Sequence, residues 1–153
     1  MLFRSRDTNA PNITSVLNAN ATNLFIHFAE PVAAASALNL ANYNLAGATV
    51  LGAELSADAH TVILHTTPLT FQNSYTLSVA GIVDRASAPN ALVAVQVPFT
   101  AREFNANAVG NGSQAGVVNL VGSGANVTGG GNEIGGNADQ FQFAWQSVTG
   151  NFD

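Results

Sequence analysis

The fold of this chain is decided by one stretch, Leu69-Thr70-Phe71-Gln72-Asn73-Ser74-Tyr75-Thr76-Leu77-Ser78-Val79. Its last residues alternate: Tyr75, Leu77 and Val79 are separated by small hydroxyl residues. A period of two is typical of a strand that buries one face and leaves the other in water. We therefore expect a loop that turns into a half-buried strand, with the tyrosine at the corner.

Six further segments have the length and pattern of strands, and turn residues separate them. They are residues 13–17, 24–28, 42–45, 48–55, 61–66 and 93–99. Gly52 marks a bulge in one of them, and the Ala- and Leu-rich residues 33–40 predict a short helical turn. Seven short strands with period-two patterning predict an all-β chain, an antiparallel sandwich.

The core of this sandwich is predicted from the strand parity, because side chains two apart share one face of a strand. The structural residues expected there are Leu24, Ile26, Phe28, Val62, Leu64, Leu69, Leu77 and Val79, together with Tyr75 at the corner.

Composition excludes several classes of protein. Only 8% of the residues are charged, the net charge is -5, and there is no Lys and no Cys. An acidic chain is a poor ligand for nucleic acid or an anionic membrane, since both require a basic surface. No disulfide or thiolate metal site can form. No apolar run approaches about 18 residues, so membrane insertion is not expected. A surface covered by Asn, Thr, Ser, Ala and Gly is typical of secreted bacterial proteins.

Residues 8–101 resemble the bacterial Ig-like modules related to fibronectin type III and to the Ig-like domains of S-layer proteins. The resemblance rests on the order of several short motifs: Leu24-Phe25-Ile26-His27-Phe28-Ala29-Glu30-Pro31-Val32, Asn42-Tyr43-Asn44-Leu45, Val62-Ile63-Leu64, Leu69 with Tyr75-Thr76-Leu77-Ser78-Val79, and Asp84 with Asn90. It implies a seven-stranded antiparallel Ig-like β-sandwich. It also implies a tyrosine corner, in which the Tyr75 hydroxyl bonds back to upstream backbone.

The two ends of the chain have a different character. Residues 1–7 are expected to be a non-native or disordered start, because Leu2-Phe3-Arg4-Ser5 resembles the translation of a sequencing adapter. Residues 102–116 are rich in Asn, Gly and Ala and predict a linker. Beyond them we expect a strand at 117–121, a tight turn at Gly129-Gly130-Gly131, and a strand with an aromatic face made of Phe141, Phe143 and Trp145.

Residues 117–153 resemble the truncated start of a second bacterial β-sandwich domain of the concanavalin or laminin-G type. The matching segments are Glu133-Ile134-Gly135-Gly136, Asp139-Gln140-Phe141-Gln142-Phe143 and Gly150-Asn151-Phe152-Asp153. The resemblance implies a hairpin-like fragment of that sandwich. Phe141, Phe143 and Trp145 are then candidate ligand contacts, which could stack on carbohydrate.

Candidate sites for chemistry are few. His27 and His65 share outward parity on two strands expected to be neighbours, and imidazoles across a sheet can take zinc. No third ligand of the right parity accompanies them, so we interpret them as solvated surface histidines. Asp84 beside Arg85 is explained by turn hydrogen bonding. No nucleophile triad and no glycosidase carboxylate pair is recognisable. We predict no catalytic residue, no cofactor and no metal.

The function expected from these patterns is that of a non-catalytic structural or spacer module in a secreted or cell-surface multidomain bacterial protein. Its partners would be the neighbouring domains of the parent chain, which could itself be a hydrolase. The alternative is a carbohydrate-binding accessory region of a secreted glycoside hydrolase or adhesin, with polysaccharide as partner. Nucleic acid is not an expected partner under either hypothesis.

Overall fold

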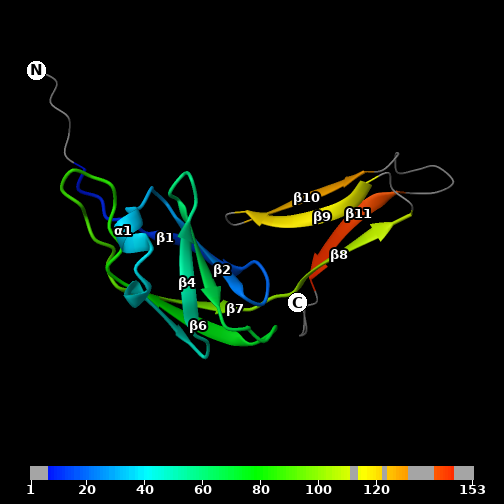
Figure 1. Cartoon of the computed structure of the whole chain (residues 1–153), viewed down its shortest axis with the longest axis horizontal. Helices are drawn as coiled ribbons and strands as arrows, with labels where there is room; N and C mark the ends of the chain where they lie inside the picture. Colours follow the sequence, from blue (N-terminus) through cyan, green and yellow to red (C-terminus); the bar gives the residue numbers. More distant parts are fainter. Residues whose placement is uncertain (1–6, 111–113, 122–123, 131–139, 147–153) are drawn as a thin grey trace, which may run out of the picture. The chain divides into compact units, whose positions relative to one another are not determined.

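A computed structural model describes residues 7–110, 114–121, 124–130 and 140–146 of the chain (Figure 1). The chain divides into two compact units, Met1–Ala101 and Arg102–Asp153. In the described residues, every pair of neighbouring strands is antiparallel. Among the described residues, no helix is long and apolar enough to cross a membrane.

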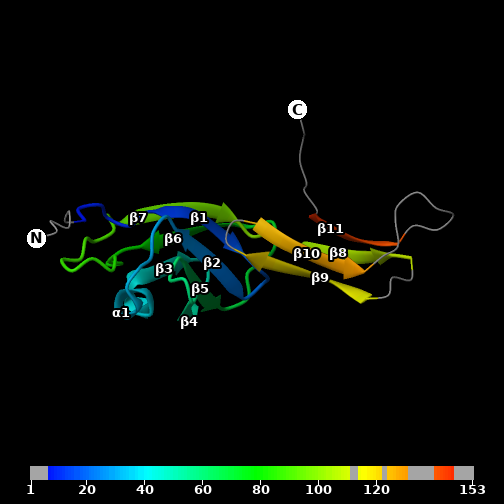
Figure 2. The ribbon, with the colours of Figure 1, turned by 90° about the horizontal axis from the view of Figure 1, so that it is seen from above.

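The first unit is a sandwich of two sheets (Figure 2). In the four-stranded sheet the order is β1 (Ile13–Asn18), β2 (Asn23–Phe28), β5 (Thr61–Thr66) and β4 (Val50–Leu55). In the three-stranded sheet the order is β3 (Tyr43–Ala46), β6 (Ser74–Val79) and β7 (Val95–Thr100). Lettered along the chain, these orders are A-B-E-D and C-F-G, the arrangement of a constant-type Ig sandwich. The prediction of an all-β, antiparallel sandwich is confirmed.

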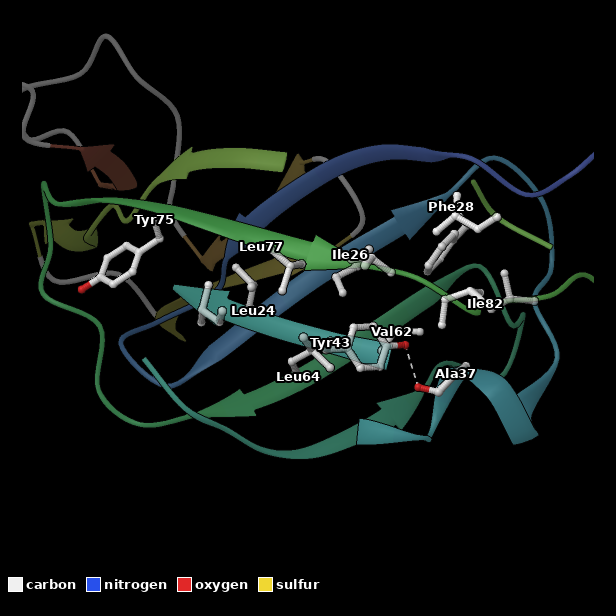
Figure 3. Close-up of a cluster of buried hydrophobic side chains, with 14 of the residues drawn as sticks. Leu24, Ile26, Phe28, Ala37, Tyr43, Val62, Leu64, Tyr75, Leu77 and Ile82 are labelled. Carbon is white, nitrogen blue, oxygen red and sulfur yellow. Dashed lines mark hydrogen bonds between the residues drawn. The ribbon is translucent and has the colours of Figure 1, made fainter. Parts of the chain in front are cut away.

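The core lies between these sheets and contains every apolar residue that strand parity places there (Figure 3). Leu24, Ile26, Phe28, Val62, Leu64 and Leu77 are fully buried, and Val79, Leu69 and Tyr75 expose 1%, 4% and 9% of their surface. Residues from the connections complete the core, among them Val32, Ile82 and Leu92. The predicted bulge is present, since the β4–β5 register shifts between Val50 and Gly52.

The tyrosine corner sits where the loop at 69–73 enters β6. The hydroxyl oxygen of Tyr75 accepts a hydrogen bond of 2.8 Å from the backbone N–H of Thr70. Its ring stacks on Phe99 of β7, with 5.7 Å between the ring centroids. The N–H of Leu69 donates to the carbonyl of Ala21 across to the other sheet. The corner therefore ties the crossover loop to both sheets, as the sequence predicted.

A second tyrosine anchors the short helical region. Helix α1 (Ala34–Ala37) lies in the predicted helical segment 33–40. The 3-10 turn η1 (Leu40–Asn42) begins at the last residue of that segment and includes Asn42, which was expected to begin the next strand. The hydroxyl of Tyr43 donates a buried hydrogen bond of 2.7 Å to the carbonyl of Ala37 (Figure 3). Burial raises the pKa of Tyr43 well above its ordinary value of 10.0, because the phenolate would have to lose its hydration.

The last strand begins later than predicted. Val93 was expected at its start, but β7 begins at Val95, and Val93 is 80% exposed. The reason is the register: Val95 pairs with Val79, the last residue of β6, so β6 ends before it could pair with Val93.

The described residues of the second unit form two two-stranded sheets. In one, β8 (Phe104–Val109) pairs with β11 (Phe141–Gln146), and in the other, β9 (Gln114–Val121) pairs with β10 (Gly124–Gly130). Strands β9 and β11 cover the two segments predicted to be strands. The linker expected at 102–116 instead contains all of β8 and the first residues of β9. Every residue of β8 pairs with β11, so pairing overrides the low strand propensity of Asn and Ala.

In the second unit, glycines allow the two sheets to pack closely, and Gly129 and Gly130 do not form the predicted turn. Gly129 and Gly130 lie within β10. A Cβ atom at Gly129 would lie 2.6 Å from Cβ of Gln142 on β11, too close for any larger residue. Gly116 on β9 likewise faces the Gln142 side chain. The two sheets therefore approach each other through glycines. Residues 1–6, Gly131, and the predicted motifs at 133–136 and 150–153 lie outside the described residues.

Candidate functional site

The aromatic residues of β11 lie on one face of the β8–β11 sheet. Phe143 and Trp145 pair with Asn107 and Asn105 of β8, and directly paired residues point to the same side. Gln142 has the opposite parity and packs against Gly116 and Gly129 of the β9–β10 sheet. The aromatic side chains therefore point away from the β9–β10 sheet.

This aromatic face is open to solvent. Phe143 and Trp145 expose 53% and 40% of their surface, and Val109 exposes 40%. The indole N–H of Trp145 donates a hydrogen bond of 2.9 Å to the side-chain oxygen of Asn107. The face is uncharged, and its residues are Asn105, Asn107, Val109, Phe141, Phe143 and Trp145. It combines flat apolar rings with amide groups on one surface.

The structure places His27 and His65 far apart, although strand parity predicted that they share one face of the sheet. On neighbouring strands β2 and β5, His27 pairs with Thr61, whereas His65 pairs with Asn23. His27 and Asn23 are four residues apart on one strand, which is about 13 Å. Nδ1 of His65 contacts the Asn23 side-chain oxygen at 2.9 Å, and its Nε2 contacts a carboxylate oxygen of Glu54 at 3.0 Å. These two histidines cannot share one metal ion.

His27 instead lies beside His60, which precedes β5. The two ring centroids are 6.1 Å apart and the rings are tilted by 30°. The sequence pattern gave no indication of this neighbour, because His60 occupies a turn where parity does not apply. The nearby carboxyl of Asp58 has a pKa below its ordinary value. The largest cause is the hydrogen bond from the Ser56 hydroxyl, followed by the hydrogen bond from the His60 backbone N–H. Electrostatic interactions with the His60 and His27 side chains lower the pKa by smaller amounts.

Asp84 has the turn role that the sequence predicted. Its Oδ1 accepts hydrogen bonds from the N–H groups of Ala86 and Asn90, and its Oδ2 accepts one from the Asn90 side chain at 2.6 Å. Burial opposes ionisation of this carboxyl, but the three hydrogen bonds outweigh it, and the pKa of Asp84 lies below its ordinary 3.8. Oxygens of Asp7, Glu30 and Asp84 lie within 4.8 Å of one another. Burial, followed by the charges of Asp7 and Asp84, raises the pKa of Glu30.

Comparison with known proteins relates this chain to a bacterial surface protein by its fold. No protein-family model matches the sequence, and no curated protein matches it. Three solved structures of the bacterial S-layer protein SbsC are similar in fold. The N-terminal part of SbsC has a TM-score of 0.58 and 18% identity over 92% of this chain. The structure of SbsC domains 1–6 has a TM-score of 0.56 and 16% identity over 94% of this chain. The structure of SbsC residues 31–844 has a TM-score of 0.56 and 17% identity over 92% of this chain.

These SbsC structures are much longer than the present chain. The chain covers 42% of the first and 24% of each of the others. At identities below 20%, the likeness establishes a shared β-rich fold.

Proposed function

We propose that this chain is a non-catalytic structural module of a bacterial cell-surface protein, in which residues 8–101 act as a spacer between neighbouring domains. The observation that carries the proposal is the fold similarity to S-layer protein SbsC over more than nine-tenths of the chain. The chain's location would be extracellular, either secreted or attached to the cell surface. A hydrolase domain, if the parent protein has one, would lie elsewhere in it.

The path of the backbone through the first unit supports a spacer. The segment that leads into β1 and the end of β7 lie at opposite ends of the sandwich (Figures 1 and 2). A chain that enters at one end and leaves at the other holds its neighbours a full sandwich length apart. The continuous apolar core and the corner at Tyr75 support the expectation that this unit unfolds cooperatively, as a spacer requires.

Single-molecule force measurements test the spacer. The chain has no Cys, so cysteines introduced at Thr8 and Glu103 in the full chain provide specific handles. A cooperative sandwich should unfold in one step that releases about 95 residues, or about 300 Å of contour length after subtraction of the folded length. Gradual extension without a discrete step would refute the spacer role.

The location is tested separately. Antibodies raised against the chain should label intact cells of the source organism, and external protease should remove the signal. Labelling only after permeabilisation would exclude a surface protein while leaving the mechanical result untouched.

The second candidate function is carbohydrate binding, and the open aromatic face favours it. Phe143 and Trp145 present exposed rings, and the hydrogen bond to Asn107 orients the indole. Aromatic rings can stack on the apolar faces of sugars, while nearby amides can hydrogen-bond hydroxyl groups. An uncharged face suits a neutral polysaccharide better than a charged polymer.

Co-sedimentation of the chain with insoluble polysaccharides, including cellulose, chitin and peptidoglycan, tests this second function. Trp145→Ala and Phe143→Ala should each reduce the bound fraction at least fivefold. Val127→Ala is the matched control, because Val127 is an exposed apolar residue on the other sheet of the same unit. Binding that is absent in the wild type, or equal in all variants, would exclude the aromatic face as a carbohydrate site.

A further inference from the structure

Two histidines from different segments of the first unit lie close together on rigid backbone. His27 is in β2, between the buried residues Ile26 and Phe28, so its side chain points to the outer face of the sheet. His60 ends the connection between β4 and β5, and its carbonyl accepts a hydrogen bond of 2.8 Å from the N–H of Phe28. This bond and the β2–β5 pairing hold the two imidazole rings near each other, with centroids 6.1 Å apart.

The hydrogen bonds of the two rings leave the same nitrogen free in each. Nδ1 of His60 lies 3.2 Å from the carbonyl oxygen of Phe28, which can only accept. In the neutral ring this contact favours the tautomer in which Nδ1 donates and Nε2 has the lone pair. Nδ1 of His27 lies 3.0 Å from the hydroxyl of Thr61. Within the described parts of the chain, neither Nε2 has a hydrogen-bond partner. Metal-binding histidines are typically held in this way, through an outer hydrogen bond from the second nitrogen.

The spacing of the rings is close to that of two imidazoles on one ion. With a Zn–N bond of about 2.1 Å, each ring centroid lies about 3.2 Å from the metal. A tetrahedral angle then places the two centroids about 5.3 Å apart. The observed 6.1 Å exceeds this by less than 1 Å. Small changes of the χ1 angles of the two side chains move the ring centroids and can absorb such a difference.

We propose that His27 and His60 form a two-histidine site for a divalent transition-metal ion such as Zn²⁺, Ni²⁺ or Cu²⁺. Imidazole nitrogen is a preferred ligand of these ions. Water would fill the remaining coordination positions, and the exposed carboxylate of Asp58, in the same β4–β5 connection, adds favourable negative charge. A bound ion would clamp this connection onto β2. The site is independent of both the spacer and the carbohydrate proposals.

Titration calorimetry of the full, tag-free chain with ZnCl₂ and with NiCl₂ tests the site. The chain contains three histidines, and the third supplies a matched control: His65 lies on the same sheet with both ring nitrogens already engaged. We expect one ion per chain, binding at least tenfold weaker in His27→Ala and in His60→Ala, and binding unchanged in His65→Ala. For a dissociation constant of about 50 µM, 1 mM metal should raise the folded-to-unfolded ratio about 20-fold.

A measurement on the wild-type chain keeps the test independent of variant folding. In two-dimensional NMR of the imidazole groups, Zn²⁺ should shift the resonances of His27 and His60 and leave those of His65 in place. The proposal is overturned if His65→Ala weakens binding as much as the other variants, or if the double variant of His27 and His60 still binds. It is equally overturned if Glu30→Gln abolishes binding while His27→Ala does not, which would assign the ion to the carboxylates near Asp84.

Discussion

Replacement of Tyr75 by phenylalanine removes one hydroxyl group from the corner of the first unit. The ring can stay where it is, stacked on Phe99, so the change deletes the hydrogen bond with little change in packing. In the variant, the backbone N–H of Thr70 no longer has the Tyr75 hydroxyl as its hydrogen-bond acceptor, which lies 2.8 Å away in the wild type.

The expected cost of Tyr75→Phe follows from the exposure of the two partners. A buried donor left without a partner costs about 1–3 kcal/mol. Tyr75 is 9% exposed, but Thr70 is an exposed residue, and water can partly replace the lost acceptor. We therefore expect the free energy of unfolding to fall by about 0.5–1.5 kcal/mol. For a unit of this size, that lowers the melting temperature by about 2–6 °C.

Two measurements test this prediction. Urea unfolding followed by far-UV circular dichroism gives the stability, and the fluorescence of the chain's single tryptophan, Trp145, reports on the second unit as an internal control. Hydrogen exchange gives the local effect. The Thr70 amide should exchange faster in the variant, relative to the amides of Leu69 and Gln72, which donate to backbone carbonyls.

The tyrosine-corner reasoning would be refuted by one combined result. If Tyr75→Phe leaves both the unfolding midpoint and the relative protection of the Thr70 amide unchanged, the hydrogen bond does not stabilise the fold. A loss of stability without faster exchange at Thr70 would assign the effect to the ring instead.

Three further predictions concern the same unit. Tyr43→Phe should lower the free energy of unfolding by about 1–3 kcal/mol, more than Tyr75→Phe does, because the Tyr43 hydroxyl and the Ala37 carbonyl that accepts its hydrogen bond are both buried. An equal or smaller loss of stability than in Tyr75→Phe, measured by urea unfolding, would contradict this. Gly81→Ala should cost at least about 1–2 kcal/mol, since Gly81 has a φ of +71° and a Cβ there would lie 2.7 Å from the Asn42 side-chain oxygen. Gly52→Ala, which has no positive φ and only ordinary contacts, is its control, and equal melting temperatures for the two variants would show that the backbone argument is wrong. Asp84→Asn should lower the melting temperature at neutral pH. The folded-state pKa of Asp84 lies below its ordinary 3.8, so its stabilisation is complete above about pH 3.8 and is lost as the pH falls through the lower folded value. A wild-type advantage that persists at a pH well below that value would contradict the assignment.

Local pattern was sufficient for the architecture because strand parity is a property of neighbouring residues. Alternation alone placed Leu24, Ile26, Phe28, Val62 and Leu64 in the core, and all are fully buried. The turn chemistry of Asp84 was predictable for the same reason, since its partners lie within six residues along the chain. The hydrogen bond of Tyr75 was implied by the resemblance to Ig-like modules, and its partner is also local.

Tertiary structure decided what depends on residues far apart in sequence. Composition at 102–116 indicated a linker, but pairing with β11, about 35 residues later, makes a strand of it. Gly129 was predicted to lie in a turn, but it lies in β10, where the absence of a side chain leaves room for Gln142 of the β8–β11 sheet. Strand parity predicted that His27 and His65 lie on the same face of the sheet, but it could not predict the register between their strands. The observed register places the two histidines far apart. His60, in a turn, lies next to His27 instead. The sequence by itself determined which face of each strand is buried, because that requires only neighbouring residues. The partners across each strand and turn were decided by the three-dimensional fold, because strand register and the approach of loops are set by packing over the whole unit.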